Sequence, residues 1–178
     1  MKKALKLFAI ILAVIILDQV SKDYLLYMVS GSVPMTANAL DIVPFSWIIT
    51  RVTSFFNIVF TWNHGASFSM FRNLGMAAPF VPACFTGLII GFIGYYTFRR
   101  ARAAERVPLA LILGGALGNL IDRIRFGAVI DFLDFHIGDW HYPSFNVADI
   151  CICIGVGLYL LNWFLARRNN CNVSKDGK

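Results

Sequence analysis

The chain has 178 residues, of which 58% are hydrophobic and 15% are charged, and its net charge at pH 7 is +6. Soluble domains carry about 25% charged residues, so this composition indicates a membrane protein. No basic stripe with interleaved aromatic residues is present, which argues against a nucleic-acid-binding function. The length suits a single domain, 1–178.

Four apolar stretches predict membrane-spanning helices, because each approaches the roughly 20 residues needed to cross a bilayer core. They lie at about residues 4–28, 74–98, 107–124 and 145–166. The first begins like a signal peptide, with lysines ahead of an apolar run. Charged residues and a renewed apolar pattern then take the place of a cleavage site, so we interpret it as a retained helix.

Basic residues predict the orientation of these helices. Clusters at 2–6, 99–106 and 167–168 fall on one side of the membrane if the chain crosses four times. The positive-inside rule makes that side the cytoplasm, with both termini inside. Segments 29–73 and 125–144 are then extracytoplasmic.

The longer outer segment contains a strand-rich stretch at 44–71, with Ile, Val, Phe, Trp and Thr between turn residues. It predicts a small extracytoplasmic sheet, whereas 125–144 is expected to form a short loop. The polar end of the chain, 169–178, predicts a disordered tail. GxxxG spacings at Gly87 and Gly91, and at Gly114 and Gly118, predict close helix packing.

Ionisable residues within membrane spans are costly and usually mark function. Asp18 and Lys22 are four residues apart and therefore share one helix face. The predicted arrangement of four spans brings further polar groups to the outer membrane surface. They are Asn119, Asp122, Arg123, Asp131, Asp134, Asn146 and Asp149. A purely structural ion pair is the alternative for Asp18 with Lys22, and for Asp122 with Arg123.

Two N-x-x-D spacings occur among these residues. Asn119 with Asp122, and Asn146 with Asp149, are three residues apart, which puts each Asn beside its Asp on one helix face. The Asn side chain can then hold the neighbouring carboxylate by hydrogen bonding.

Asp131 and Asp149 lie in apolar surroundings with no adjacent basic residue. Two carboxylates close together in a low-dielectric site cannot both ionise, so one keeps a proton and the other acts as a base. Such a pair can activate water for attack on a peptide carbonyl. We expect no metal and no cofactor, because neither HExxH nor CxxC spacing occurs.

Other functions remain open on the residues alone. Gly65-Ala-Ser-Phe68 has the GxSx shape of intramembrane serine proteases, but no histidine within a span is available as its base. A small transporter or channel would predict polar residues through the whole bilayer depth. A structural membrane subunit would not explain two isolated acids at one depth.

Five ordered sequence blocks resemble the lipoprotein signal peptidase (signal peptidase II) family over residues 7–166. They are Leu17-Asp-Gln-Val-Ser-Lys22, Asn63-His-Gly-Ala-Ser-Phe68, Gly114-Gly-Ala-Leu-Gly-Asn-Leu-Ile-Asp-Arg123, Val129-Ile-Asp-Phe132 and Phe145-Asn-Val-Ala-Asp149. The resemblance implies a bacterial inner-membrane aspartyl endopeptidase with four membrane helices, a small extracytoplasmic sheet and a lid. Such an enzyme removes the signal peptide of diacylglyceryl-modified prolipoproteins by cleaving before the lipidated cysteine.

The resemblance also assigns roles to residues. It implies that Asp131 and Asp149 are the catalytic pair, at the surface of the outer leaflet. The residues that it implies support the site or bind substrate are Asp18, Lys22, Asn63, Gly65, Phe68, Asn119, Asp122, Arg123 and Asn146. The expected partners are a diacylated prolipoprotein and membrane lipid, with no nucleic acid, and we expect a monomer.

Overall fold

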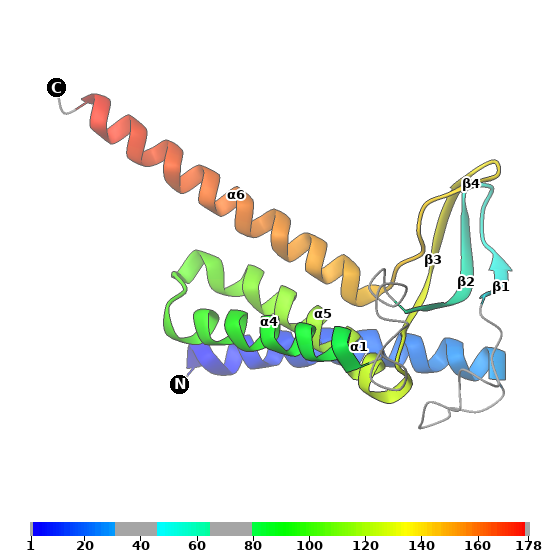
Figure 1. Cartoon of the computed structure of the whole chain (residues 1–178). Helices are drawn as coiled ribbons and strands as arrows, with labels where there is room; N and C mark the ends of the chain where they lie inside the picture. Colours follow the sequence, from blue (N-terminus) through cyan, green and yellow to red (C-terminus); the bar gives the residue numbers. More distant parts are fainter. Residues whose placement is uncertain (1, 31–45, 65–79, 177–178) are drawn as a thin grey trace.

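The computed structural model describes residues 2–30, 46–64 and 80–176. These ranges contain helices packed side by side and a small sheet at one end of them (Figure 1). The helices are α1 (Lys2–Ser30), α4 (Phe80–Arg99), α5 (Ala103–Phe126) and α6 (Val147–Asp176). The strands are β1 (Ser46–Arg51), β2 (Phe56–Asn63), β3 (Val129–Ile137) and β4 (Trp140–His141). The two termini lie at the end of the molecule away from the sheet.

Three of the described helices are long and apolar enough to cross a membrane. The qualifying segments are Ala4–Ser30, Ala103–Phe126 and Val147–Arg168. The stretch predicted as a span at 74–98 corresponds to α4, of which the structure describes Phe80–Arg99. The count of four spans therefore stays a prediction.

Helix α5 lies at the centre of the bundle and packs against the other three helices. Small residues allow this close approach: a Cβ atom built on Gly114 would lie 2.7 Å from Cβ of Val14 on α1. One built on Gly118 would lie 2.5 Å from a carboxylate oxygen of Asp18. The predicted packing role of this GxxxG pair is confirmed.

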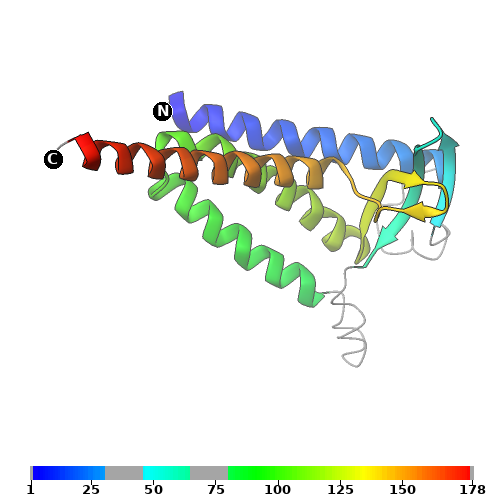
Figure 2. The same ribbon diagram turned by 90° about the horizontal axis from the view of Figure 1, so that it is seen from above.

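The other GxxxG pair behaves differently. No described neighbour lies within 4 Å of a Cβ atom built on Gly87 or Gly91. The prediction that they form a close helix contact is wrong for the described residues. Figure 2 gives the reason, because α4 diverges from α1 toward its own N-terminal end.

The sheet has the order β1-β2-β3-β4, with antiparallel pairing throughout. Strands β3 and β4 come from segment 125–144, so the loop predicted there is wrong, and the lid stays a prediction. The β-branched and aromatic residues of Val129–Ile137 favour a strand. Gly127, with a φ of 74°, ends α5 in the left-handed conformation and lets the chain turn directly into β3. Asp131 consequently lies on a strand and not on a loop.

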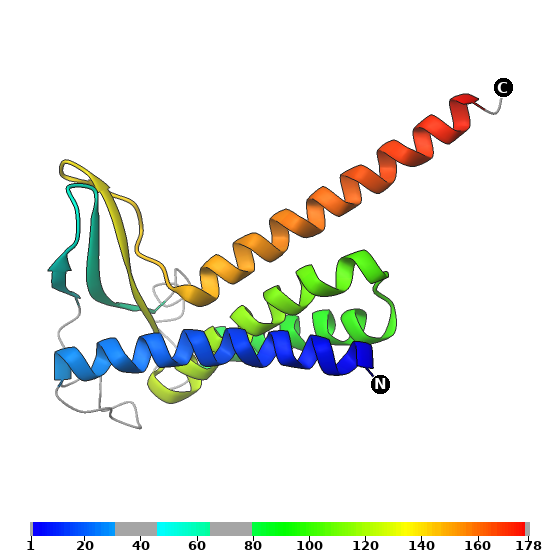
Figure 3. The ribbon, with the colours of Figure 1, turned by 180° about the vertical axis from the view of Figure 1, so that it is seen from behind.

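An apolar cluster joins the sheet to the helix ends. Its buried members are Leu26, Phe60, Trp62, Phe126, Ala128 and Ile130. Because they come from α1, β2, α5 and β3, this cluster holds the sheet in a defined position over the bundle. Figure 3 shows the strands running across the direction of α1.

Helix α6 continues to Asp176. The helix thus includes 169–176, the first eight residues of the predicted tail, and the disorder of that tail stays a prediction. The stretch is polar, but it contains neither proline nor glycine before Gly177, so nothing in it interrupts the helical backbone.

Candidate active site

A buried ion cluster lies where α1 meets the C-terminal part of α5. Lys22 Nζ lies 2.8 Å from Asp18 Oδ2 and 2.8 Å from Asp122 Oδ2, with side-chain exposures of 1%, 0% and 0%. It also donates to Asn119 Oδ1 at 3.0 Å. The prediction that Asp18 and Lys22 pair on one helix face is confirmed. Asp122 pairs with Lys22, so the alternative of a simple ion pair with Arg123 is wrong.

The two carboxylates of this cluster also hold the segments that carry the candidate catalytic acids. Asp18 Oδ1 accepts the backbone N–H of Ala148 at 2.9 Å, in the first turn of α6. Asp122 Oδ2 accepts the backbone N–H of Ile130 at 3.2 Å, at the start of β3. Asp149 follows Ala148 in the chain, and Asp131 follows Ile130. The ion cluster therefore fixes the backbone directly before each candidate catalytic acid.

Asp131 is 1% exposed, and both of its carboxylate oxygens accept hydrogen bonds. Asn146 Nδ2 donates to Oδ1 at 2.7 Å, and Asn63 Nδ2 donates to Oδ2 at 2.8 Å. Burial raises the pKa of Asp131 to about 7; the Asn63 hydrogen bond opposes the rise, and the charge of Asp149 adds to it.

Asp149 lies in the first turn of α6, where it exchanges hydrogen bonds with Asn146. The backbone N–H of Asn146 donates to Asp149 Oδ2 at 3.2 Å, and the backbone N–H of Asp149 donates to Asn146 Oδ1 at 3.0 Å. This reciprocal arrangement is a capping box. Asn119 Nδ2 donates to the other oxygen, Oδ1, at 2.9 Å.

The asparagine of the first N-x-x-D motif therefore hydrogen-bonds to the aspartate of the second motif. We predicted that Asn119 would hold Asp122, but its amide serves Asp149, because Lys22 already occupies Asp122. The side-chain amide of Asn146 serves Asp131, while its side-chain oxygen caps α6. Each asparagine thus links elements that are separate in the sequence.

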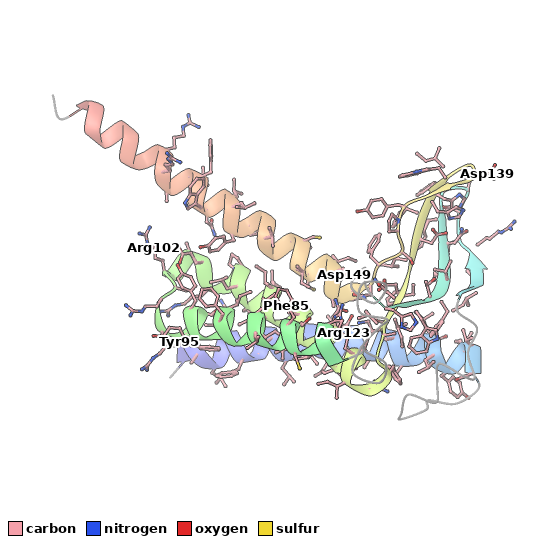
Figure 4. The ribbon with its side chains drawn as sticks, viewed as in Figure 1. Phe85, Tyr95, Arg102, Arg123, Asp139 and Asp149 are labelled. Atoms are coloured by element: carbon pink, nitrogen blue, oxygen red, sulfur yellow. The ribbon has the colours of Figure 1, made fainter. Side chains whose placement is uncertain are left out.

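Asn146 contacts both candidate catalytic acids. Its side chain bonds Asp131 and its backbone bonds Asp149, and Asn146 itself is fully buried. Arg123 lies at the same junction of α5 and α6, as does Asp149 (Figure 4). Its guanidinium donates to the backbone oxygen of Asn119 at 3.2 Å and is within electrostatic range of both acids. The structure therefore brings these predicted residues together at one place.

Gly65 and Phe68 lie outside the described residues. Their predicted position facing the substrate stays a prediction.

Gln19 also belongs to the site, although its sequence position alone predicted no role for it. Its amide donates to Asp122 Oδ1 at 2.9 Å and to Asp18 Oδ2 at 3.2 Å, and its oxygen accepts from Arg125 at 3.1 Å. A glutamine directly beside Asp18, within a membrane span, was the available signal.

A second polar network lies on the sheet, away from the ion cluster. Asp134 accepts hydrogen bonds from His141 at 2.8 Å and from Asn57 at 2.9 Å. Burial alone would raise the pKa of Asp134, but these bonds hold it below its usual value. Among the residues that the structure describes, no group of three His, Cys, Asp or Glu side chains is arranged to hold a metal ion.

An apolar groove adjoins Asp149. It has a volume of about 360 Å³. Its lining residues are Tyr142, Phe145, Asp149, Ile150, Cys153 and Ile154. One acid thus faces a space that can accept apolar groups, and the arrangement can place a carboxylate pair beside a substrate held in that space.

Comparisons with known proteins agree with this chemistry. The family model described as signal peptidase (SPase) II matches residues 10–165. A lipoprotein signal peptidase of Anaplasma phagocytophilum (strain HZ) is 38% identical over 162 residues, covering 90% of this chain and 92% of that protein. One from Serratia marcescens is 34% identical over 172 residues, covering 92% and 98%.

Two solved structures of bacterial membrane enzymes share the fold of this chain. One bacterial membrane enzyme aligns with a TM-score of 0.67 and 28% identity over 92% of this chain and 90% of its own. Another aligns with a TM-score of 0.62 and 26% identity over 89% and 92%.

Proposed function

We propose that Asp131 and Asp149 form the catalytic pair of this chain. The chain belongs to the signal peptidase II family, and it is therefore an aspartic endopeptidase that processes prolipoproteins. Membership confirms the resemblance read from the sequence. The observation that carries the residue assignment is the position of Asn146, which hydrogen-bonds to Asp131 through its side chain and to Asp149 through its backbone.

The pair holds one proton in the resting enzyme, and that proton resides on Asp131. Support comes from the burial of Asp131, which raises its pKa to about 7. Asp149 accepts a proton from water as the water oxygen attacks the scissile carbonyl, and Asp131 donates its proton to the carbonyl oxygen. Collapse of the tetrahedral intermediate breaks the C–N bond, and the leaving amine takes a proton from the pair.

The supporting residues have two kinds of role in this proposal. Asn63, Asn119 and Asn146 orient the two carboxylates through hydrogen bonds. The ion cluster Asp18, Lys22 and Asp122 fixes the segments that carry them. Arg123 lines the site beside both acids, and Gly65 and Phe68 are assigned to substrate binding.

The substrate is a prolipoprotein whose cysteine carries a diacylglyceryl group, and cleavage occurs just before that cysteine. The groove beside Asp149 suits this substrate, because its other lining residues are Tyr142, Phe145, Ile150, Cys153 and Ile154. An acyl chain or an apolar signal-peptide side chain can occupy such a groove without desolvating polar groups.

The enzyme is a monomer in the bacterial inner membrane, with α4 as its fourth span and both termini in the cytoplasm. The active site then lies at the surface of the outer leaflet. Support comes from the basic clusters at 2–6, 99–106 and 167–168, which all belong to the end of the molecule away from the sheet.

The test is cleavage of a diacylated prolipoprotein by purified enzyme, followed by gel shift. Asp131→Asn and Asp149→Asn should each abolish cleavage while the protein still inserts in the membrane. Asp139→Asn is the matched control, because this acid lies at the exposed tip of the β3–β4 hairpin (Figure 4) and should leave cleavage unchanged. Full activity of either variant of the pair would contradict the assignment. EDTA should have little effect, whereas strong inhibition reversed by zinc would indicate a metal enzyme.

A further inference from the structure

The hairpin formed by β3 and β4 has two chemically different faces. Alternate strand residues point to opposite sides, so Leu133, Phe135 and Ile137 share the face of Asp131. The pairing register places Trp140 opposite Ile137, which extends this apolar face onto β4. Together with Tyr142, whose N–H bonds to the oxygen of Phe135, these residues form a continuous apolar surface.

The opposite face of the hairpin is polar. Asp134 and His136 alternate with the apolar residues, and His141 pairs with His136 across the strands. The two histidine rings stack with centroids 4.9 Å apart, and Asp134 is hydrogen-bonded to His141 and Asn57.

The apolar face of the hairpin is exposed, whereas the opposite face is part buried and part exposed: His141 on that face has a side-chain exposure of 48%, and Ile130 and Phe132 on the same side of β3 are buried. Ile137 is 79% exposed, Trp140 is 62% exposed and Tyr142 is 53% exposed, whereas Asp134 is 5% exposed. An antiparallel sheet in water buries its apolar face and solvates its polar one. A contiguous exposed apolar surface of this kind marks an interaction site.

The position of the hairpin identifies what covers this surface. The strands run across the direction of α1 and rise beside the N-terminal end of α6 (Figures 1 and 3). Ring contacts continue from Trp140 to Tyr142 at 6.5 Å and from Tyr142 to Phe145 at 6.1 Å. Tyr142 and Phe145 line the groove with Ile150 and Ile154 of α6, so the apolar face is continuous with the surface that α6 presents to lipid.

We propose that the apolar face of this hairpin, made by Phe135, Ile137, Trp140 and Tyr142, is a membrane-contact surface that rests on the outer leaflet beside α6. The occupant is phospholipid at the boundary between headgroups and acyl chains. Tryptophan and tyrosine favour this depth because their rings are apolar and each carries one hydrogen-bonding group. The proposal rests on α6 crossing the membrane and on the outer position of the sheet in the proposed function.

Tryptophan fluorescence tests the contact directly. The full-length protein is reconstituted in phosphatidylcholine vesicles whose acyl chains carry bromine close to the headgroup. The signal of Trp140 is the difference between wild type and Trp140→Phe, so the other tryptophans need no change. We expect that difference signal to lose most of its intensity in brominated vesicles and to be protected from aqueous iodide.

Two further variants sharpen the result. Ile137→Asp puts a charge on the apolar face and should restore the Trp140 signal in brominated vesicles. His136→Gln changes the polar face of the same hairpin and should leave the quenching intact.

An outcome in which iodide quenches Trp140 and brominated lipid does not would overturn the proposal. So would protection of Trp140 only after lipidated substrate is added, because the surface would then bind substrate. The measurement involves no cleavage, so its failure is distinguishable from a failure of the catalytic assignment.

Discussion

Asn146 and Asp149 cap each other at the start of α6, with N–H donation in both directions at 3.2 and 3.0 Å. The box that begins this helix therefore contains a proposed catalytic acid. Helix initiation and the orientation of the Asp149 carboxylate depend on the same two hydrogen bonds, so substitutions at Asn146 can separate stability from catalysis.

Asn146→Ala should remove both functions. Loss of an N-cap costs about 1 kcal/mol of stability, and Asp131 also loses its 2.7 Å amide donor. Asn146→Ser keeps an N-cap oxygen but cannot reach Asp131 with an amide, so its thermal stability should stay close to wild type. We expect cleavage to fall by about 100-fold or more in both variants, by analogy with loss of one aligned hydrogen-bond donor. Wild-type cleavage by Asn146→Ser would show that the amide is dispensable.

The pH profile should report Asp131. Burial raises its pKa to about 7, so the carboxyl is protonated below that pH and ionised above it. Because the pair needs that proton, kcat/KM should fall as the pH rises through about 7. Asn63→Ala removes a hydrogen bond that lowers this pKa, so the falling limb should move to higher pH. Asn57→Ala is the control, because its amide serves Asp134. A limb that stays in place in Asn63→Ala would assign it to another group.

Lys22→Met should be strongly destabilising. It leaves Asp18 and Asp122 without their shared cation in a site where all three side chains are at most 1% exposed. Removing one partner of a buried ion cluster costs about 3–5 kcal/mol. Thermal unfolding in detergent measures the loss. Lys6→Met, on the exposed surface of α1, is the matched control, and equal melting temperatures for the two variants would contradict the prediction.

Gly118→Ala and Gly91→Ala form a matched pair of helix substitutions. A methyl group at Gly118 would meet Asp18, whereas one at Gly91 has no described neighbour within 4 Å. We expect Gly118→Ala to lower stability by about 1–3 kcal/mol through overpacking. Gly91→Ala should leave it unchanged or raise it by up to about 1 kcal/mol, because alanine favours helix. The same unfolding assay compares them, and a larger loss for Gly91→Ala would refute the packing argument.

Local patterns predicted some parts of this molecule well. Hydropathy over about 20 residues located α1, α5 and α6, and the four-residue spacing of Asp18 and Lys22 predicted their ion pair. Both signals arise within one helix, where periodicity determines which residues are neighbours.

Other parts depend on contacts between elements and could not be read locally. Spacing places Asn119 beside Asp122, but only the packing of α1 on α5 shows that Lys22 occupies that carboxylate. Segment 125–144 is short and joins two predicted spans, which favours a loop, although its β-branched and aromatic residues favour a strand. Its pairing partner β2 lies more than 60 residues earlier in the chain.

The bond from the Ala148 N–H to Asp18 joins residues that are 130 positions apart. A ribosome has therefore made most of the protein before this bond can form. Until α6 joins the earlier helices, Asp18 lacks this donor and the Asn146–Asp149 capping box cannot form. The proposed catalytic pair is thus incomplete in the nascent chain, because Asp149 is carried by the last helix to be inserted.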